Sequence, residues 1–287
     1  MTETIEEVIL RYSQRGIPYI RRYVSDNCCE KAAQEILSWE KGVVFLTTGF
    51  YVAGYAETDG PAGTVVLALA LQRLGYQPVI LTDQPCQGFF ELEMLPTVYV
   101  PYDADQETFR ELIETYQPKG MISVERCGRN RFLQYANMRG VSISEHTAPI
   151  DELFVAYQGV IPSIGVGDGG NEIGMGKIAG AISRKLSLEP CVVSTDILVV
   201  ATVSNWGAYG IVAALSGRVG QKLLPDFSWI KSYITKTVEI GSVDGVTHEL
   251  TCTVYGKSML TEQEIITALL INQFDTKYMY SFRTKKI

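Results

Sequence analysis

The sequence predicts an α/β fold in which a mostly parallel sheet is covered by helices on both faces, in a three-layer, Rossmann-like arrangement. Short apolar runs without polar alternation recur along the chain, and segments of helical period separate them. Each run ends in glycine or in small polar residues. Uninterrupted apolar runs are typical of parallel strands that are buried on both faces, and helices connect such strands.

The elements can be assigned in chain order. Apolar residues at helical spacing, Ile5, Val8, Ile9 and Tyr12, predict a helical N-terminal segment within residues 1–40. The expected strands cover residues 43–47, 78–82, 97–100, 120–124, 160–166 and 196–201. The expected helices cover residues 63–74, 89–94, 108–116, 177–188, 226–237 and 261–274. A small α+β extension ends the chain, with a hairpin over 238–256 and a last helix capped by Thr261 and Glu264.

Length and composition indicate one soluble domain over residues 1–287, because no linker, repeat or low-complexity tract divides the chain. The net charge of −7 and the lack of a Lys/Arg-rich run argue against a nucleic-acid partner. No apolar segment reaches the roughly 18–20 residues that span a bilayer. The acidic start resembles no signal peptide, so we expect a cytoplasmic protein. The composition is compatible with a homo-oligomer.

Cysteines and histidines limit the chemistry that is available. The six cysteines show no metal-knuckle spacing, and the adjacent Cys28 and Cys29 fit buried free thiols better than metal ligands. The chain has two histidines, His146 and His248. Catalysis is therefore expected to depend mainly on carboxylates, arginines, backbone amides or a metal ion.

A glycine-rich run at residues 165–176 is the most informative segment. It contains six glycines and follows a predicted strand, an arrangement that directs unpaired N–H groups toward an anion. Its spacing matches neither a dinucleotide fingerprint nor a Walker loop, so no organic cofactor is expected. Asn171 suits a helix cap as well as a ligand contact, whereas Asp168 and Glu172 are better candidates for ligand binding.

A second cluster of polar residues follows the first predicted strand. It combines Thr48 and Gly49 with the turn at residues 57–63. Asp59 suits either the cap of the following helix or a cation ligand, while Glu57 has no capping role at its spacing. Two carboxylates in a glycine-rich turn suit Mg²⁺ or Mn²⁺, which prefer oxygen ligands.

Two further clusters follow later strands. Arg126 and Arg129 are either part of a solvated loop or a clamp for a carboxylate, which guanidinium binds in a bidentate manner. Cys127 is a weak candidate nucleophile because no histidine lies near it in sequence. The segment 204–210, with Asn205, suggests a pocket wall at a helix start. Asp83 and Asp151 are weaker candidates that suit caps or turns.

Taken together, these segments resemble the D-glutamate cyclase family over roughly residues 40 to 275. The matching pieces are residues 48–50, 57–61, 125–126, 128–130, 138–140, 151 and 165–176. The resemblance implies reversible dehydration of D-glutamate to 5-oxo-D-proline and water. It also implies metal dependence for related members, and a Mn²⁺-dependent phosphatase activity has been attributed to the fold.

Cyclisation of D-glutamate requires a base for its ammonium group, an acid for the departing oxygen, and neutralisation of the γ-carboxylate. We expect these roles from acidic residues, with a Mg²⁺ or Mn²⁺ ion and a small amino-acid substrate. The candidate catalytic residues are Glu57, Asp59, Glu125, Asp168 and Glu172, and all of these except Glu125 are also candidate metal ligands. The candidate substrate-binding residues are Thr48, Gly49, Arg126, Arg129, Asn130, Gly167, Gly169, Gly170, Asn171 and Asn205. The alternatives are a Mn/Mg-dependent phosphohydrolase and a non-catalytic sensor of an amino acid or nucleotide.

Overall fold

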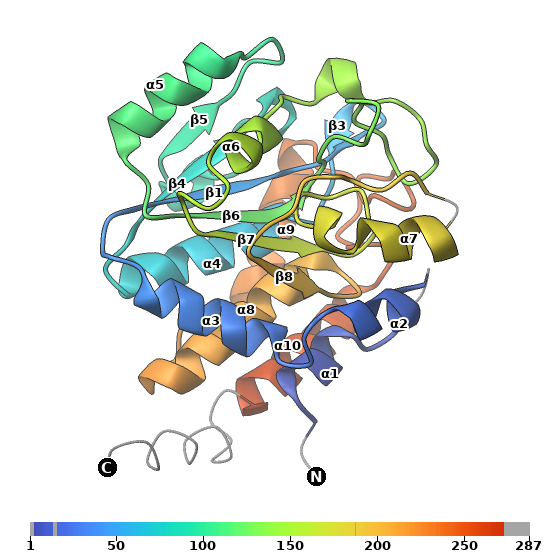
Figure 1. Cartoon of the computed structure of the whole chain (residues 1–287). Coiled ribbons are helices and arrows are strands. Elements are labelled where there is room, and N and C mark those ends of the chain that lie inside the picture. The colour runs from blue at the N-terminus through green and yellow to red at the C-terminus, as the bar shows by residue number, and fades with distance from the viewer. Residues whose placement is uncertain (1–2, 14–15, 187, 273–287) are drawn as a thin grey trace.

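Six parallel strands form the central sheet of this protein (Figure 1). The computed structural model describes residues 3–13, 16–186 and 188–272. The strands are β1 (Val43–Gly49), β4 (Gln77–Thr82), β5 (Thr97–Tyr99), β6 (Gly120–Arg126), β7 (Ser163–Gly167) and β8 (Ile197–Val200). Their order across the sheet is β5-β4-β1-β6-β7-β8, and every neighbouring pair is parallel. The predicted fold class is confirmed.

Helices cover both faces of the sheet, as Figure 1 shows. One side carries α1 (Ile5–Ile9), α3 (Cys28–Ser38), α4 (Pro61–Arg73), α8 (Ser204–Val219), α9 (Phe227–Ile240) and α10 (Met259–Asn272). The other side carries α2 (Ile17–Ile20), α5 (Gln106–Tyr116), α6 (Asp151–Ala156) and α7 (Ala179–Lys185). Short 3₁₀ turns cover Arg21–Tyr23, Gln84–Cys86, Glu91–Glu93, Ser144–His146 and Gly176–Ile178. In the described part of the chain, no helix is both long and apolar enough to cross a membrane.

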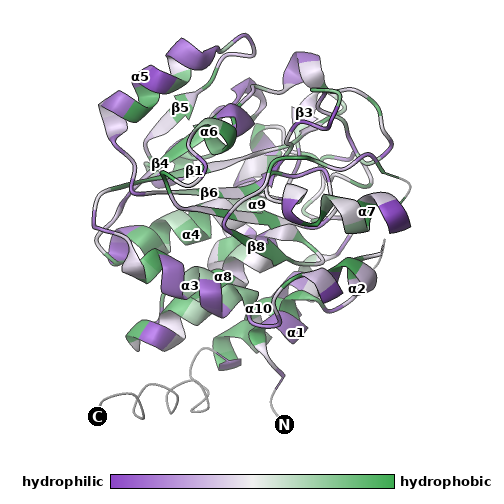
Figure 2. Cartoon of the chain, viewed as in Figure 1, coloured by the Kyte–Doolittle hydropathy of each residue, from purple (hydrophilic) through white to green (hydrophobic). Residues whose placement is uncertain are grey.

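Alternation of side chains along each strand produces two cores. Val44 and Leu46 of β1 pack with the α4–α8 side, while Phe45 between them packs with α5 and α6. Both sets are buried, which explains why the strands read as continuous apolar runs. The hydropathy of the helices differs in the same way with burial. In Figure 2, α4 and α8 are mainly hydrophobic, whereas α5 carries hydrophilic residues on its outer side.

The last helix begins earlier than predicted. It starts at Met259, and the N–H of Glu262 bonds to the carbonyl of Ser258. Thr261 therefore lies within the first turn, and the predicted Thr261–Glu264 capping box is wrong. Residues 273–274, the predicted end of this helix, lie outside the described residues.

The predicted hairpin over 238–256 is also wrong, because residues 238–240 complete α9 and the rest of the segment is an irregular loop. Asp244 organises the loop: its carboxylate accepts N–H bonds from Val246, Thr247 and Gly256 at 2.7–2.9 Å. Side-chain acceptors here replace the strand partners that a hairpin would supply. The small antiparallel hairpin lies instead between β1 and α4, as β2 (Tyr51–Val52) and β3 (Tyr55–Ala56).

Candidate active site

The strand order places a topological switch point between β1 and β6. From β1 the chain proceeds outward through β4 and β5, then returns to β6 and continues through β7 and β8. Open α/β sheets bind ligands at the carboxyl ends of the strands beside such a point. The loops after the strands gather on the side where β3 and α7 lie (Figure 1). The predicted site residues follow these strands, so the topology brings them to one edge.

A cleft of about 640 Å³ opens at this edge. Its polar floor includes Glu125, which lies near the end of β6, and Glu57 and Asp168, which follow β3 and β7, together with Asn171. The hairpin β2–β3, the segment 137–146 and the loop 245–255 form its walls. Four of the predicted site residues therefore line one cavity.

Three acids meet at the floor or just behind it. Carboxylate oxygens of Asp59, Glu125 and Asp168 lie within 4.8 Å of one another, and all three residues are buried. Burial raises the pKa of Asp59 to about 7. Burial, and then repulsion from Asp168, Glu172, Asp59 and Glu57, raises the pKa of Glu125 well above its ordinary value. Such a group of acids must retain protons or bind a cation, and its oxygen donors suit Mg²⁺ or Mn²⁺.

Glu125 has an unusual backbone. Its φ of +47° lies in the left-handed region, at a point where the pairing of β1 with β6 shifts register. A non-glycine residue in this region costs free energy, and such residues cluster at functional sites. The Ser204 hydroxyl donates a hydrogen bond to the Glu125 carboxylate. Backbone and hydrogen bond together hold this carboxyl group at the cleft floor.

Asp59 and Asn205 cap each other's helices. The Asp59 carboxylate, just before α4, accepts N–H bonds from Ser204 and Asn205 at 3.0 and 2.8 Å, at the start of α8. In return, the Asn205 side-chain oxygen accepts the N–H groups of Gly60 and Gly63 at 3.0 and 2.7 Å, at the start of α4. Asp59 is thus a helix cap, as one interpretation held, but for a helix that is distant in sequence.

The reciprocal capping by Asp59 and Asn205 occupies amides that bind phosphate in other proteins of this fold. In dinucleotide-binding proteins the N-terminus of the helix after the first strand binds the pyrophosphate. Here the corresponding N–H groups of Gly60 and Gly63 donate to Asn205. Asn205 therefore binds the start of α4 behind the cleft floor, and the N-terminus of α4 is not open to a phosphate.

A carboxylate within the glycine run binds the run's own amides. The Glu172 carboxylate accepts the N–H groups of Gly169 and Gly170, each at 2.8 Å. A Cβ atom at Gly167 would lie 2.8 Å from a Glu172 oxygen, and one at Gly169 would lie 2.6 Å from the Met138 sulfur. These glycines make room for Glu172 and Met138, and the two amides expected to bind a substrate oxyanion are already occupied. Glu172 shapes the loop from a buried position.

The two predicted arginines pair with buried acids. Arg126 forms an ion pair with Asp83 at 2.6 Å and donates to the carbonyl oxygens of Gly49 and Ala148. Arg129 bonds to Asp151 at 2.8 Å and to Glu152 at 3.0 Å. Neither side chain is among the described residues that line the cleft. The structure therefore does not bring them together with the acid cluster.

Other predicted contacts lie behind the cleft surface. Asn130 accepts the N–H groups of Phe132 and Gln134, which shapes its own loop. Thr48 is buried, and its side-chain oxygen lies 2.5 Å from a Cβ atom placed at Gly60. Asn171 does line the cleft, and its amide donates to the carbonyl of Ala136 at 2.8 Å.

Three basic residues in the cleft were not predicted as site residues. Arg139, His146 and His248 line it, and all three are exposed. His146 stacks on Tyr51 with ring centroids 4.2 Å apart. Arg139 belongs to residues 138–140, one of the segments that carry the family resemblance, and that segment could have identified it as a site residue. The two histidines belong to no recognisable motif. Long loops bring them to the cleft, and their position there could not be predicted from local sequence.

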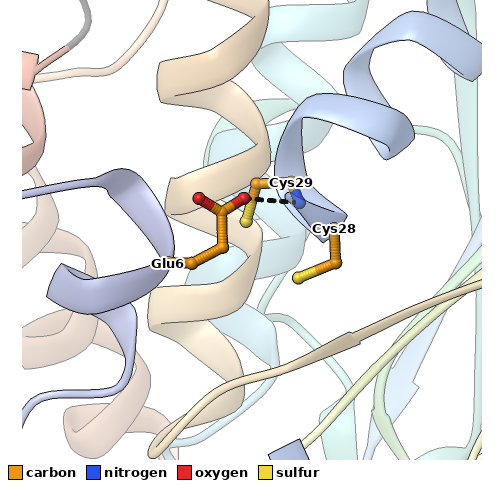
Figure 3. Close-up of side chains that lie close together, drawn as sticks. All are labelled: Glu6, Cys28 and Cys29. Atoms are coloured by element: carbon orange, nitrogen blue, oxygen red, sulfur yellow. Dashed lines mark hydrogen bonds between the residues drawn. The ribbon is translucent and has the colours of Figure 1, made fainter. Parts of the chain in front are cut away.

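All six cysteines are free thiols, and Cys252 alone is only partly buried. Burial raises the pKa of Cys127 far above its ordinary value, which disfavours a thiolate nucleophile. Cys28 and Cys29 begin α3 and lie beside the Glu6 carboxylate (Figure 3). Glu6 accepts the Cys29 N–H at 3.1 Å, so it caps α3 from α1. Cys28 and Cys29 are buried and form no disulfide, and their sulfur atoms lie within 4.8 Å of each other and of a Glu6 oxygen, so their assignment as free thiols rather than metal ligands stays a prediction.

The fold and the cleft define a Rossmann-like α/β protein with an acidic site at its switch point. Comparison with known families is more specific: residues 5–270 match the family described as D-glutamate cyclase-like, C-terminal, and the chain belongs to that family. It is 34% identical over 198 residues to a human protein named "D-glutamate cyclase, mitochondrial". The alignment covers 60% of this chain and 32% of the human protein, so the chain spans about a third of that relative's length.

Proposed function

We propose that this protein is a hydro-lyase that interconverts D-glutamate and 5-oxo-D-proline plus water. The main support is the charge arrangement of the cleft, which has buried acids at its floor and Arg139, His146 and His248 in its walls. An amino acid carries a cationic ammonium group and an anionic α-carboxylate. The acids match the ammonium group, and the basic side chains match the carboxylate. Family membership supports the same reaction.

Glu57 and Glu125 are the two glutamates at the cleft floor, and they suit the two proton transfers. Glu57 accepts a proton from the ammonium group, so that the amine can attack the γ-carboxyl carbon. Glu125, whose pKa is raised by burial and by neighbouring acids, supplies the proton that leaves with the departing oxygen. Arg139 binds the α-carboxylate and thereby orients the amine.

We also propose a divalent cation at the floor. Asp59 and Asp168 would hold it, because their oxygens and one from Glu125 lie within 4.8 Å of one another. Bound there, Mg²⁺ or Mn²⁺ would offset the charge of the acids and polarise the γ-carboxyl group.

A phosphohydrolase is less well supported. It needs anion-binding amides at the glycine loop or at a helix N-terminus. The amides of Gly169 and Gly170 donate to Glu172, and those of Gly60 and Gly63 donate to Asn205. The groups that would bind a phosphate in this fold are therefore occupied.

The test is incubation of the protein with D- or L-glutamate, with Mn²⁺ or with EDTA, followed by mass spectrometry for 5-oxoproline. We expect product from the D-enantiomer at a rate far above the enzyme-free control. Asp168→Asn removes one floor charge with little change in shape, and it should lower the rate by about 100-fold or more. The matched control is Asp103→Asn, an exposed acid outside the cleft, which should retain activity. Absence of product under every condition contradicts the proposal.

A further inference from the structure

The cleft is larger than a free amino acid requires. Its volume of about 640 Å³ lies within the range of pockets that enclose drug-sized ligands, about 300–1,000 Å³. Glutamate would occupy only the region between the acid cluster and the basic wall residues. The remaining space is part of the same cavity, so a substrate can extend into it.

The remaining walls are largely apolar. Tyr51 and Val52 come from the β2–β3 hairpin, and Val246 and Tyr255 come from the loop after α9. Val246 is 39% exposed, and Tyr51 is partly exposed and stacks on His146. Apolar and aromatic surface of this kind favours a ligand group that is itself apolar or planar. D-glutamate has no such group to offer.

Electrostatics at the floor favour a neutral γ-group. Glu57, Glu125 and Asp168 line the floor, and Asp59 and Glu172 lie behind it. A γ-carboxylate brings a further negative charge to a floor that already carries three carboxyl groups, and the divalent cation proposed there offsets that charge only in part. A γ-amide adds no charge, and its carbonyl carbon is a better electrophile than that of a carboxylate.

We propose that the preferred substrate is a γ-D-glutamyl amide, whose glutamyl part occupies the charged region and whose amine part lies against Tyr51, Val246 and Tyr255. This inference rests on the proposed function, because it uses the same floor residues and the same ring closure. The reaction is then a cyclotransfer that releases an amine in place of water.

The bonds and protons balance without a co-reactant. Glu57 takes one proton from the α-ammonium group, and the amine nitrogen forms a bond to the γ-carbonyl carbon. The bond from that carbon to the amide nitrogen then breaks. Glu125 donates a proton to the departing nitrogen, and the proton that the ring nitrogen still has to lose returns to Glu125. Glu57 passes its proton to the released amine, which leaves as an ammonium ion. The products are 5-oxo-D-proline and a free amine, with no water consumed and no change of oxidation state.

The experiment compares four substrates with the wild-type protein: D-glutamate, D-glutamine, γ-D-glutamyl methylamide and γ-D-glutamyl benzylamide. The two substituted amides are both alkylamides, and they differ mainly in the apolar ring. We measure 5-oxoproline and the released amine by mass spectrometry and subtract the enzyme-free rates. The expected kcat/KM rises from D-glutamate to the amides, and the benzylamide exceeds the methylamide by about tenfold or more, the value of burying one ring.

A wall variant tests the position of the amine part. Val246→Ser makes the wall polar, and it should raise KM for the benzylamide more than for the methylamide. Turnover of D-glutamate with equal or lower kcat/KM for the amides overturns this inference and leaves the proposed function standing. Turnover of the amides alone supports the inference and removes the hydro-lyase reaction. Absence of 5-oxoproline from all four substrates overturns both.

Discussion

Glu125 shows how a single residue at this site combines strain with charge. Its backbone is left-handed, its carboxyl group is buried among other acids, and the Ser204 hydroxyl bonds to it. Each of the first two features opposes folding. Their coincidence at the cleft floor is what the proposed role of Glu125 as a proton donor would require.

Glu125→Gln should therefore change activity and stability in opposite directions. The amide retains an oxygen for the Ser204 hydroxyl and removes a carboxyl group whose ionised form is opposed by burial and by neighbouring acids. We expect kcat for 5-oxoproline formation to fall by about 100-fold or more, while the free energy of unfolding rises by about 1 kcal/mol. Glu111→Gln, an exposed change on α5, should alter neither quantity. An active Glu125→Gln variant would show that another group supplies the proton.

At the scale of elements, the start of α4 and the start of α8 form one unit. Neither helix has a side-chain cap from its own N-cap residue. Asp59 and Asn205 supply the caps across the interface, over 145 and 146 positions of sequence for the Asp59 bonds. Glu125 at the cleft floor and Asp59 behind it are thus positioned by helix packing as well as by the strands.

Asn205→Ala should destabilise the protein by about 1–2 kcal/mol, because the Gly63 N–H loses its acceptor and the Gly60 N–H retains only the Asp59 carboxylate. Urea unfolding measures this change. The comparison is Asp226→Ala, which removes an N-cap residue of α9 whose side chain makes no capping bond and pairs with the exposed Lys222. That variant should lose less than about 0.5 kcal/mol. Equal losses in the two variants would contradict the reciprocal capping.

The glycine run is a packing element. A Cβ atom at Gly165 would lie 2.6 Å from the carbonyl oxygen of Ile173 and 2.9 Å from the Gly174 Cα, both backbone atoms that cannot yield easily. At Gly180, the closest contact is the Arg184 side chain at 3.5 Å. The same mutation is therefore expected to have opposite consequences at these two glycines.

Gly165→Ala should lower the midpoint of thermal unfolding strongly or prevent soluble expression, since overpacking of a rigid core costs about 1–3 kcal/mol or more. Gly180→Ala, within α7, should retain or raise stability because alanine favours a helix over glycine by about 0.5–1 kcal/mol. If the two variants unfold at the same temperature, the tight packing of the run is not what Gly165 provides.

Considered as a whole molecule, the protein contains buried acids whose protonation is linked to folding. Glu262 of α10 is an example: burial raises its pKa from 4.5 to about 7, Trp206 of α8 donates an indole N–H to it at 2.6 Å, and Asp59 and Tyr209 lie near it. An acid with a raised pKa in the folded state stabilises that state when protonated. Its contribution is full below pH 4.5 and is lost as the pH rises through about 7.

We expect the free energy of unfolding to fall as the pH rises from about 5 to about 8, and Glu262→Gln to make this decline shallower. The glutamine cannot titrate but still accepts the Trp206 bond. Denaturant unfolding at a series of pH values gives the slope. Glu264→Gln, on the same helix but 52% exposed, should leave the slope unchanged. A slope that is identical in the wild type and Glu262→Gln would exclude Glu262 as a contributor.

Local sequence was sufficient for most of the fold. The six strands were predicted because residues such as Val44, Phe45 and Leu46 are all apolar, which only burial on both faces explains. The loop around Asp244 was not predictable, since its turns depend on side-chain bonds to three separate amides. The predicted start of α10 was wrong for a related reason. A capping pattern within the first turn of a helix has the same sequence as one at the true start.

For the site, the sequence by itself determined the chemical inventory: acids after the strands, a glycine run at residues 165–176, few histidines, and motifs specific enough to indicate the family. Only the tertiary structure decided which groups meet. It placed Glu57, Glu125 and Asp168 on one floor, directed Arg126 and Arg129 to Asp83 and Asp151, and brought Arg139 and both histidines to the walls. The physical reason is that residue type and spacing govern local conformation, whereas the partner of a buried charge is selected by packing between segments far apart in the chain.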